Sequence, residues 1–170
     1  MLDGAREIDA EGKRVLDLGT GSGILGLYCA LRGARVTVSD LDEQAVQFAT
    51  EAGKRLGVEL QGVTSDLFTN LPGKFELILF NPPYLPSDCL KDRTVDGGPN
   101  GIAVIKRFLE DLPKHVSKDG AALLLVSSLN NPASLTATHP EFEFSTLITR
   151  RLFFEELQVL CARFRHDLSS

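Results

Sequence analysis

The sequence predicts an α/β fold: a seven-stranded, mostly parallel sheet with an antiparallel last strand and helices on both faces. Short apolar strands alternate with helical segments over most of the chain, which is typical of parallel βαβ units. The last two predicted strands follow each other with only a short link, so they should form an antiparallel hairpin at the end of the sheet. A length of 170 residues suits one domain, and we expect residues 1–170 to form it.

Strands are predicted where β-branched and apolar residues form short runs that glycine, proline or aspartate ends. The predicted strands are 14–18, 35–40, 58–65, 75–80, 121–128, 141–149 and 155–164. Helices are predicted where apolar residues recur at helical spacing. The predicted helices are 24–31, 43–56, 101–112 and 131–138, with Asp42 as the expected N-cap of the second. Residues 85–99 are rich in proline, glycine and aspartate and should form a loop.

Composition and charge argue against several classes of protein. The net charge is −5, and an acidic surface disfavours direct binding to nucleic acid. The longest apolar run, residues 121–126, is far shorter than the roughly 20 residues of a membrane span, and the polar start does not resemble a secretory signal. Cys29, Cys89 and Cys161 lie too far apart for a metal site or a disulfide framework. A reducing, cytoplasmic location is therefore expected, with no membrane partner and no metal.

A glycine cluster, DLGTGSG (17–23), follows the first predicted strand. Alternate glycines let the backbone turn tightly and approach a ligand, and the next helix points free N–H groups at it. Residues 21–26 also fit G-x-G-x-x-G, the pattern of dinucleotide-binding proteins. Asp40 ends the second predicted strand, where a ribose-binding acid belongs. These residues alone leave both an NAD-dependent oxidoreductase and a methyltransferase open.

Three further motifs favour the methyltransferase. Asp17 stands two residues before Gly19, Ser65-Asp66-Leu67 follows the third predicted strand, and Asn81-Pro82-Pro83-Tyr84 (NPPY) directly follows the fourth. The first motif, D-x-G-x-G-x-G, resembles motif I of class I S-adenosylmethionine-dependent methyltransferases, which have a Rossmann-like sheet. NPPY in this position is similar to the motif of enzymes that methylate nitrogens conjugated to a planar system. Taken alone, NPPY could equally be a rigid loop that ends a strand.

Together these motifs resemble the HemK family of protein-glutamine N5-methyltransferases, and more narrowly its compact archaeal and eukaryotic branch. The segments DGGPNGIAVIKRFL (96–109) and RRLFFEELQVL (150–160) are similar to that branch, and the resemblance runs from about Val15 to Phe164. It implies S-adenosylmethionine as cofactor. It also implies that the methyl acceptor is the side-chain amide of the glutamine in the GGQ motif of a peptide chain release factor.

The resemblance implies a partner as well, a small zinc-binding activator subunit that pairs along the edge of the sheet. The third strand should be that edge, and residues 58–64 contain neither lysine nor proline, two residues that commonly prevent edge pairing. A short and twisted edge that stays solvated remains the alternative.

The start of the chain departs from the family pattern. HemK-like proteins usually have an upstream segment with a Pro-x-x-Asp-Thr-like motif that covers the cofactor and helps to build the acceptor pocket. Here residues 1–11 precede the first predicted strand and contain no such motif, so we expect that segment to be missing. A cofactor-binding module without catalysis is therefore a further alternative.

The resemblance also assigns cofactor roles residue by residue. Gly19 and Gly21 would lie along the methionine and ribose, and Asp17 would help to bind the methionine amino group. Asp40 would accept hydrogen bonds from the ribose hydroxyls, and Leu41 would pack on the adenine. Asp66 would accept from the adenine amino group, with the backbone of Leu67 beside it, and Asn81 would border the cofactor.

The NPPY residues would bind the acceptor amide. The side-chain oxygen of Asn81 and the backbone carbonyl of Pro82 can each accept one N–H of a glutamine amide, which orients the nitrogen and stabilises its growing positive charge. Prolines stiffen this segment, and Tyr84 offers a flat face for the amide.

Nucleic-acid enzymes are the nearest alternative, because N6-adenine and N2-guanine methyltransferases of RNA or DNA share NPPY-like loops. The tail contains four arginines, Arg150, Arg151, Arg163 and Arg165, whereas the net charge is acidic. An NAD-dependent oxidoreductase is less consistent with the sequence, which offers no Ser/Tyr/Lys or His/Asp constellation that we can place.

Overall fold

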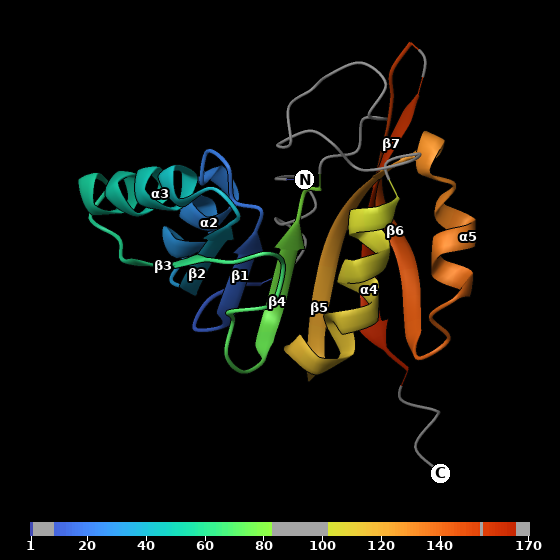
Figure 1. Ribbon diagram of the computed structural model, residues 1–170, viewed down its shortest axis with the longest axis horizontal. Helices are drawn as coiled ribbons and strands as arrows, with labels where there is room; N and C mark the ends of the chain where they lie inside the picture. Colours follow the sequence, from blue (N-terminus) through green and yellow to red (C-terminus); the bar gives the residue numbers. More distant parts are fainter. Residues whose placement is uncertain (2–8, 83–101, 154, 166–170) are drawn as a thin grey trace.

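The computed structural model describes residues 1, 9–82, 102–153 and 155–165. Its elements in chain order are β1 (Arg14–Leu18), α2 (Ile24–Ala30), β2 (Arg35–Asp40), α3 (Glu43–Arg55), β3 (Leu60–Thr64), β4 (Phe75–Phe80), α4 (Ala103–His115), β5 (Val116–Ser127), the 3-10 helix η3 (Ser128–Asn130), α5 (Pro132–Ala137), β6 (Phe142–Arg151) and β7 (Glu156–Phe164) (Figure 1). The predicted loop at residues 85–99 lies outside the described residues.

All seven strands form one sheet in the order β3-β2-β1-β4-β5-β7-β6. Strands β1 to β5 pair in parallel, and β7 pairs antiparallel with β5 and with β6, as the missing crossover between the last two strands predicts. The chain builds the sheet outward from β1 to β3 and then returns to place β4 on the other side of β1. Ligands of such sheets bind beyond the carboxyl ends of the strands at this change of direction.

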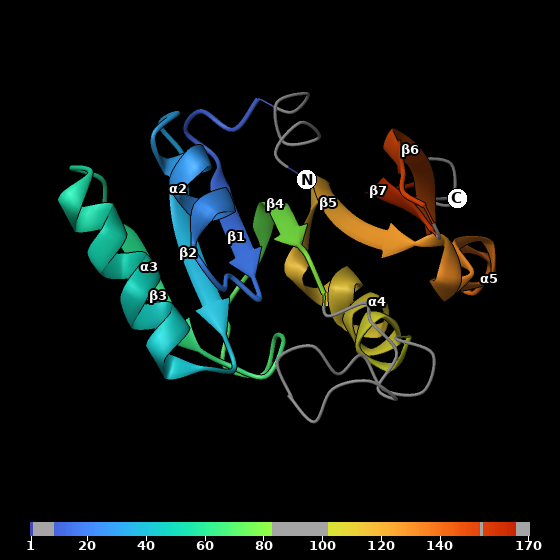
Figure 2. The same cartoon turned by 90° about the horizontal axis from the view of Figure 1, so that it is seen from above.

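Helices cover both faces of the sheet (Figure 2). Because successive residues of a strand point to opposite faces, each central strand contributes to two cores. Val15 and Leu77 belong to the core beneath α2 and α3, whereas Leu16 and Ile78 belong to the core beneath α4 and α5. These four side chains are fully buried. The near-continuous apolar sequences of β1 and β4 thus reflect central strands with two buried faces.

Two predicted boundaries differ from the structure by three residues or more. Helix α4 continues past Pro113 to His115, because packing holds its last turn: the His115 ring stacks on Phe68 at a centroid distance of 4.4 Å. Strand β5 begins at Val116, five residues before the apolar run that predicted it. Val116 pairs with Phe75, and the register then shifts before the pairing resumes further along both strands.

The two edges of the sheet differ. Strand β3 is a short edge of five residues, and Gly62 allows α3 to lie close, since a Cβ atom there would come within 2.6 Å of Val46. Strand β6, the opposite edge, has ten residues and a bulge at which Leu147 is the extra residue opposite β7. Within the part of the chain that the structure describes, no helix is long and apolar enough to cross a membrane.

Candidate cofactor and acceptor site

The glycine loop lies at the carboxyl end of β1 and is hydrogen-bonded to the end of β2. Thr20 N–H donates to the Ser39 carbonyl at 2.9 Å, and Gly21 N–H donates to Asp40 Oδ2 at 2.9 Å. Asp42 N–H donates to the other Asp40 oxygen, Oδ1, at 3.1 Å. Each Asp40 oxygen keeps a lone pair, so the carboxylate is fixed in orientation and can still accept from a ligand hydroxyl.

Asp17 lies beneath this loop and is 1% exposed. Its Oδ2 accepts two hydrogen bonds, from the Thr20 hydroxyl at 2.7 Å and from Gly26 N–H at 2.8 Å. Burial raises the pKa of the Asp17 carboxyl from an ordinary 3.8 to about 6, the two hydrogen bonds partly oppose that rise, and the Asp40 charge adds to it. A buried, electron-rich carboxylate next to a second carboxylate favours a ligand that carries positive charge.

Glycine is required where α2 approaches the loop. A Cβ atom on Gly26 would lie 2.8 Å from Val38 and 3.1 Å from Asp17 Oδ2, so a larger residue would push α2 off the sheet. Gly21 has φ +50, and a Cβ atom there would meet nothing within 4 Å. Gly26 is therefore needed for packing, whereas Gly21 leaves open space beside Asp40.

The turn after β3 lies beside Asp40, since Ser65 N–H donates to the Asp40 carbonyl at 2.9 Å. Within this turn Leu67 adopts φ +47, a left-handed conformation that costs free energy in a residue other than glycine and that is common at functional sites. Asp66 Oδ2 accepts from Arg107 of α4 at 2.9 Å, and both side chains are about half exposed. Arg107 therefore binds Oδ2 of Asp66, and Oδ1 stays available to other donors.

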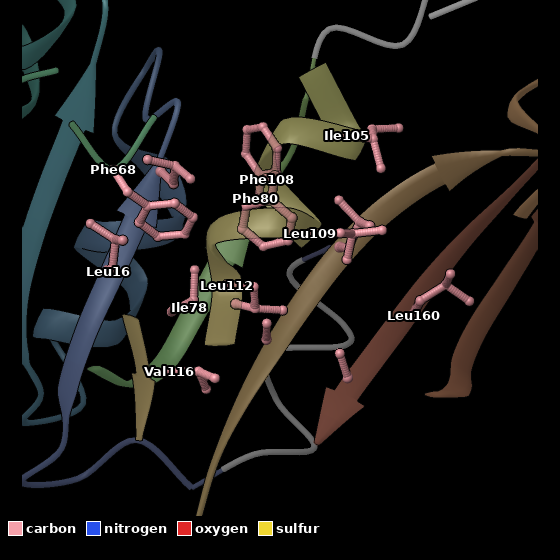
Figure 3. Packing of buried hydrophobic residues seen from close by; sticks show 14 of the residues in the cluster. Leu16, Phe68, Ile78, Phe80, Ile105, Phe108, Leu109, Leu112, Val116 and Leu160 are labelled. Carbon is pink, nitrogen blue, oxygen red and sulfur yellow. The ribbon is translucent and has the colours of Figure 1, made fainter. Parts of the chain in front are cut away.

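Helix α4 also joins this turn to the end of β4. The Phe108 ring lies 5.6 Å from the Phe68 ring and 4.6 Å from the Phe80 ring, between centroids (Figure 3). Phe80 is the last residue of β4, and Gly19 passes over it, since a Cβ atom on Gly19 would lie 3.6 Å from its ring. The aromatic cluster therefore fixes the predicted adenine side and the predicted acceptor side relative to each other.

The sequence-predicted residues lie together beyond the carboxyl ends of the parallel strands. Asp17, Gly19, Gly21, Asp40 and the 65–67 turn are linked by the contacts above, and Leu41 is 66% exposed beside Asp40. Asn81 follows Phe80 and is exposed, and Pro82 is buried. Tyr84 lies outside the described residues. The role of Asp17 in binding the methionine amino group stays a prediction.

Sequence reasoning missed two residues, Thr20 and Arg107. Thr20 lies inside the glycine loop, three positions after Asp17, and a polar residue at this spacing was the available signal. Arg107 had no local signal, because its partner Asp66 is 41 positions earlier in the chain.

The charges and exposed groups of the site suit S-adenosylmethionine. Asp17 and Asp40 suit a cation and a ribose, Asp66 suits an amino donor, and the exposed Leu41 suits a flat apolar ring.

Comparison with known proteins agrees with this assignment. Residues 5–151 match the family described as methyltransferase small domain. A putative protein N5-glutamine methyltransferase of Methanocaldococcus jannaschii is 37% identical over 164 residues, which cover 91% of this chain and 83% of that protein.

The chain belongs to the methyltransferase small domain family. This assignment decides against the nicotinamide alternative, and the cofactor of this methyltransferase is S-adenosylmethionine.

Other relatives carry names with different acceptors. A release factor glutamine methyltransferase of Deinococcus radiodurans is 34% identical over 72% of this chain and 48% of its own length. A ribosomal RNA small subunit methyltransferase C of Chromohalobacter salexigens is 32% identical over 85% of this chain and 40% of its own length. The chain thus spans less than half of these two proteins.

A solved structure extends the similarity of fold. A chain of the E. cuniculi Mtq2–Trm112 complex, which is responsible for the methylation of the eRF1 translation termination factor, superposes with a TM-score of 0.78. It is 24% identical, and the match covers 96% of this chain and 92% of that chain.

Asp17→Asn should stabilise the free methyltransferase at pH 7 by about 1–3 kcal/mol, because Asn can accept the same two hydrogen bonds without a buried charge. The folded wild-type chain binds more protons than the unfolded chain between pH 3.8 and about 6, so its stability relative to the variant should fall as the pH rises through that range. Urea unfolding at pH 4 and pH 7 measures both effects.

Asp42→Asn controls for the loss of one negative charge, since Asn is an equally good N-cap. An Asp17→Asn variant that is less stable than wild type at pH 7 would contradict the account of Asp17.

Proposed function

We propose that this methyltransferase transfers a methyl group to the side-chain amide nitrogen of a protein glutamine, and that the acceptor is the GGQ glutamine of a peptide chain release factor. The observation that carries the proposal is the place of Asn81 and Pro82 at the carboxyl end of β4, directly beside the glycine loop. The names of the M. jannaschii and D. radiodurans relatives support a glutamine acceptor.

S-adenosylmethionine supplies an electrophilic methyl group, whose bond to sulfur breaks as the acceptor nitrogen bonds to the carbon. The protein must therefore hold that nitrogen in line with the breaking bond. An amide nitrogen is a weak nucleophile, because its lone pair is delocalised into the carbonyl. The Asn81 side-chain oxygen and the Pro82 carbonyl would each accept one amide N–H and stabilise the positive charge that grows on nitrogen. The nitrogen then loses a proton to solvent.

The proposal includes the cofactor contacts. The Asp40 carboxylate, which Gly21 N–H and Asp42 N–H orient, would accept from the ribose hydroxyls. Asp66 Oδ1 would accept from the adenine amino group, with Leu67 beside the ring. Asp17 would act on the methionine portion by its charge, from beneath the loop.

An amino-methyltransferase of RNA is the second candidate, because the C. salexigens relative carries that name. The net charge of −5 argues against it. Transfer of a radiolabelled methyl group to purified release factor and, in parallel, to ribosomal RNA tests the two. Label on RNA alone would overturn the protein proposal. A cytoplasmic location is part of the proposal, since release factors act in translation there.

Asp40→Ala should weaken the binding of S-adenosylmethionine by about 1.5–3 kcal/mol, the scale of lost charge-assisted hydrogen bonds. Calorimetry measures the affinity. Asp119→Ala removes an exposed carboxylate near the opposite end of β5 and serves as the control for charge. Equal affinities in both variants would remove Asp40 from the site.

Asn81→Ala should reduce kcat by roughly 100-fold or more and leave the affinity for S-adenosylmethionine nearly intact, because one preorganised charge-stabilising acceptor is lost. Single-turnover assays with release factor measure the rate. Gln47→Ala, which removes an exposed side-chain amide from α3, is the control. Near-normal turnover of Asn81→Ala would exclude the amide clamp.

A partner subunit along β3 is a further part of the proposal. Strand β3 is an edge of the sheet, and its sequence LQGVT contains neither lysine nor proline. Beside it, an open hollow of about 640 Å³ is lined by residues that include Thr37, Gln61, Val63 and Phe75, and it could receive side chains of a strand added at this edge. The Mtq2–Trm112 complex is a precedent for a two-chain enzyme of this fold.

Co-expression with a small zinc-binding activator from the same organism should yield a complex in size exclusion. Gln61→Lys should weaken the complex, because a charged edge residue opposes strand pairing. Thr146→Lys on the opposite edge strand β6 should not. Separate elution of the two wild-type chains, together with full activity of the methyltransferase alone, would refute the partner.

A further inference from the structure

The turn between β6 and β7 lies on the same side of the sheet as the site, at the carboxyl ends of the parallel strands. Strand β7 runs antiparallel to β5, and Leu157 of β7 lies opposite Ser127 of β5. The first residue of β7, Glu156, therefore lies near the carboxyl end of β5. Figure 1 shows the β6–β7 hairpin projecting beyond the carboxyl ends of β4 and β5. We call Arg151, Leu152, Phe153 and Glu155 the hairpin tip.

The hairpin tip has an unusual composition for a turn. Tight turns favour Gly, Asn, Asp, Ser and Pro, which suit both the backbone and water. Here the turn places Leu152 and Phe153 in solvent, 48% and 100% exposed. Leu129 of η3, at the base of the hairpin, is 55% exposed as well. Clustered apolar side chains at a projecting site are typical of interaction surfaces.

The base of the hairpin holds the tip firmly. Leu152 N–H donates to the Glu155 carbonyl at 2.8 Å and closes the turn. The Ser127 hydroxyl donates to Glu155 Oε2 at 2.6 Å, and Glu156 N–H donates to the Ser128 hydroxyl at 3.0 Å. The tip is thus tied to the end of β5, and a surface that is already ordered loses little entropy when it binds a partner.

We propose that the hairpin tip is a docking element for the folded protein that carries the methyl-accepting side chain. The inference rests on the proposed protein acceptor and adds a contact outside the amide clamp. In the sheet order β5 and β7 follow β4. The tip therefore lies two strands away from Asn81, on the same side of the sheet. A folded acceptor that inserts one side chain beside Asn81 must also cover the neighbouring ends of β5 and β7, whereas a short peptide need not.

The charges at the tip favour a protein over a nucleic acid. Arg151 pairs with Glu156, between Arg151 Nε and Glu156 Oε2 at 3.2 Å, and Glu155 adds a second carboxylate. Phosphate backbones need uncompensated cations, whereas protein interfaces rely on aromatic and apolar anchors with a polar rim. Phe153 and Leu152 are anchors of that kind.

The test compares Leu152→Ser/Phe153→Ser with wild type on two acceptors, intact release factor and a short peptide with the same GGQ sequence. The variant should lose about tenfold or more in kcat/KM on the intact protein, mostly through KM, as expected when an interface anchor is removed. Its kcat/KM on the peptide and its affinity for S-adenosylmethionine should stay unchanged. Phe48→Ser, on the exposed side of α3, is the matched control and should match wild type on both acceptors.

Direct binding of release factor to wild type and variant, measured by calorimetry, separates this inference from the proposed function. Wild-type binding that the variant loses, without methyl transfer by either, would support the tip and refute the glutamine acceptor. Methyl transfer with equal kcat/KM for the intact protein in both, or an equal loss on protein and peptide, would overturn the docking role. A variant that loses affinity for single-stranded RNA but keeps its activity on release factor would overturn it too, as would a wild type that neither binds nor methylates release factor.

Discussion

A carboxylate that loses nearly all of its water needs other partners, and this requirement shapes the centre of the site. The hydrogen bonds that the structure gives to Asp17 come from Thr20 and Gly26, two neutral donors. They fold the glycine loop back over the acid and draw the first turn of α2 against β1. Gly26 must be glycine for the same reason, because a side chain there would meet Asp17 and Val38. The raised pKa of Asp17 shows that these donors do not fully replace water.

This unfavourable burial has a functional counterpart. A cationic ligand above the loop would stabilise the ionised acid that the free chain stabilises poorly, so the arrangement trades stability of the free chain for affinity. Asp40 differs, because it accepts two backbone N–H groups and lies at the rim. The two acids thus act in different ways. Asp17 contributes an electrostatic field from beneath the loop, and Asp40 offers oriented oxygen atoms to the ligand.

The sequence predicted the fold, and most of its candidate site residues lie together at the carboxyl ends of the strands, because the deciding signals are local. Glycine spacing, the Asp42 N-cap and the apolar runs of β1 and β4 depend on residues close together in the chain. The failures are contacts between distant residues. Helix α4 continued past Pro113 because Phe68 holds His115, and Arg107 reached Asp66 from another element. The position of Tyr84 stays a prediction, since it lies outside the described residues.

The unequal edges of the sheet limit how this chain can assemble. A bulge bends and twists a strand, and the extra residue Leu147 lies on β6, the outer strand at one end of the sheet. Strand β3 at the other end pairs with β2 in an unbroken register. Strand addition can therefore occur at one end of the sheet and is hindered at the other. Growth by this route stops at a pair of chains, so the fold can gain a subunit without risking a filament.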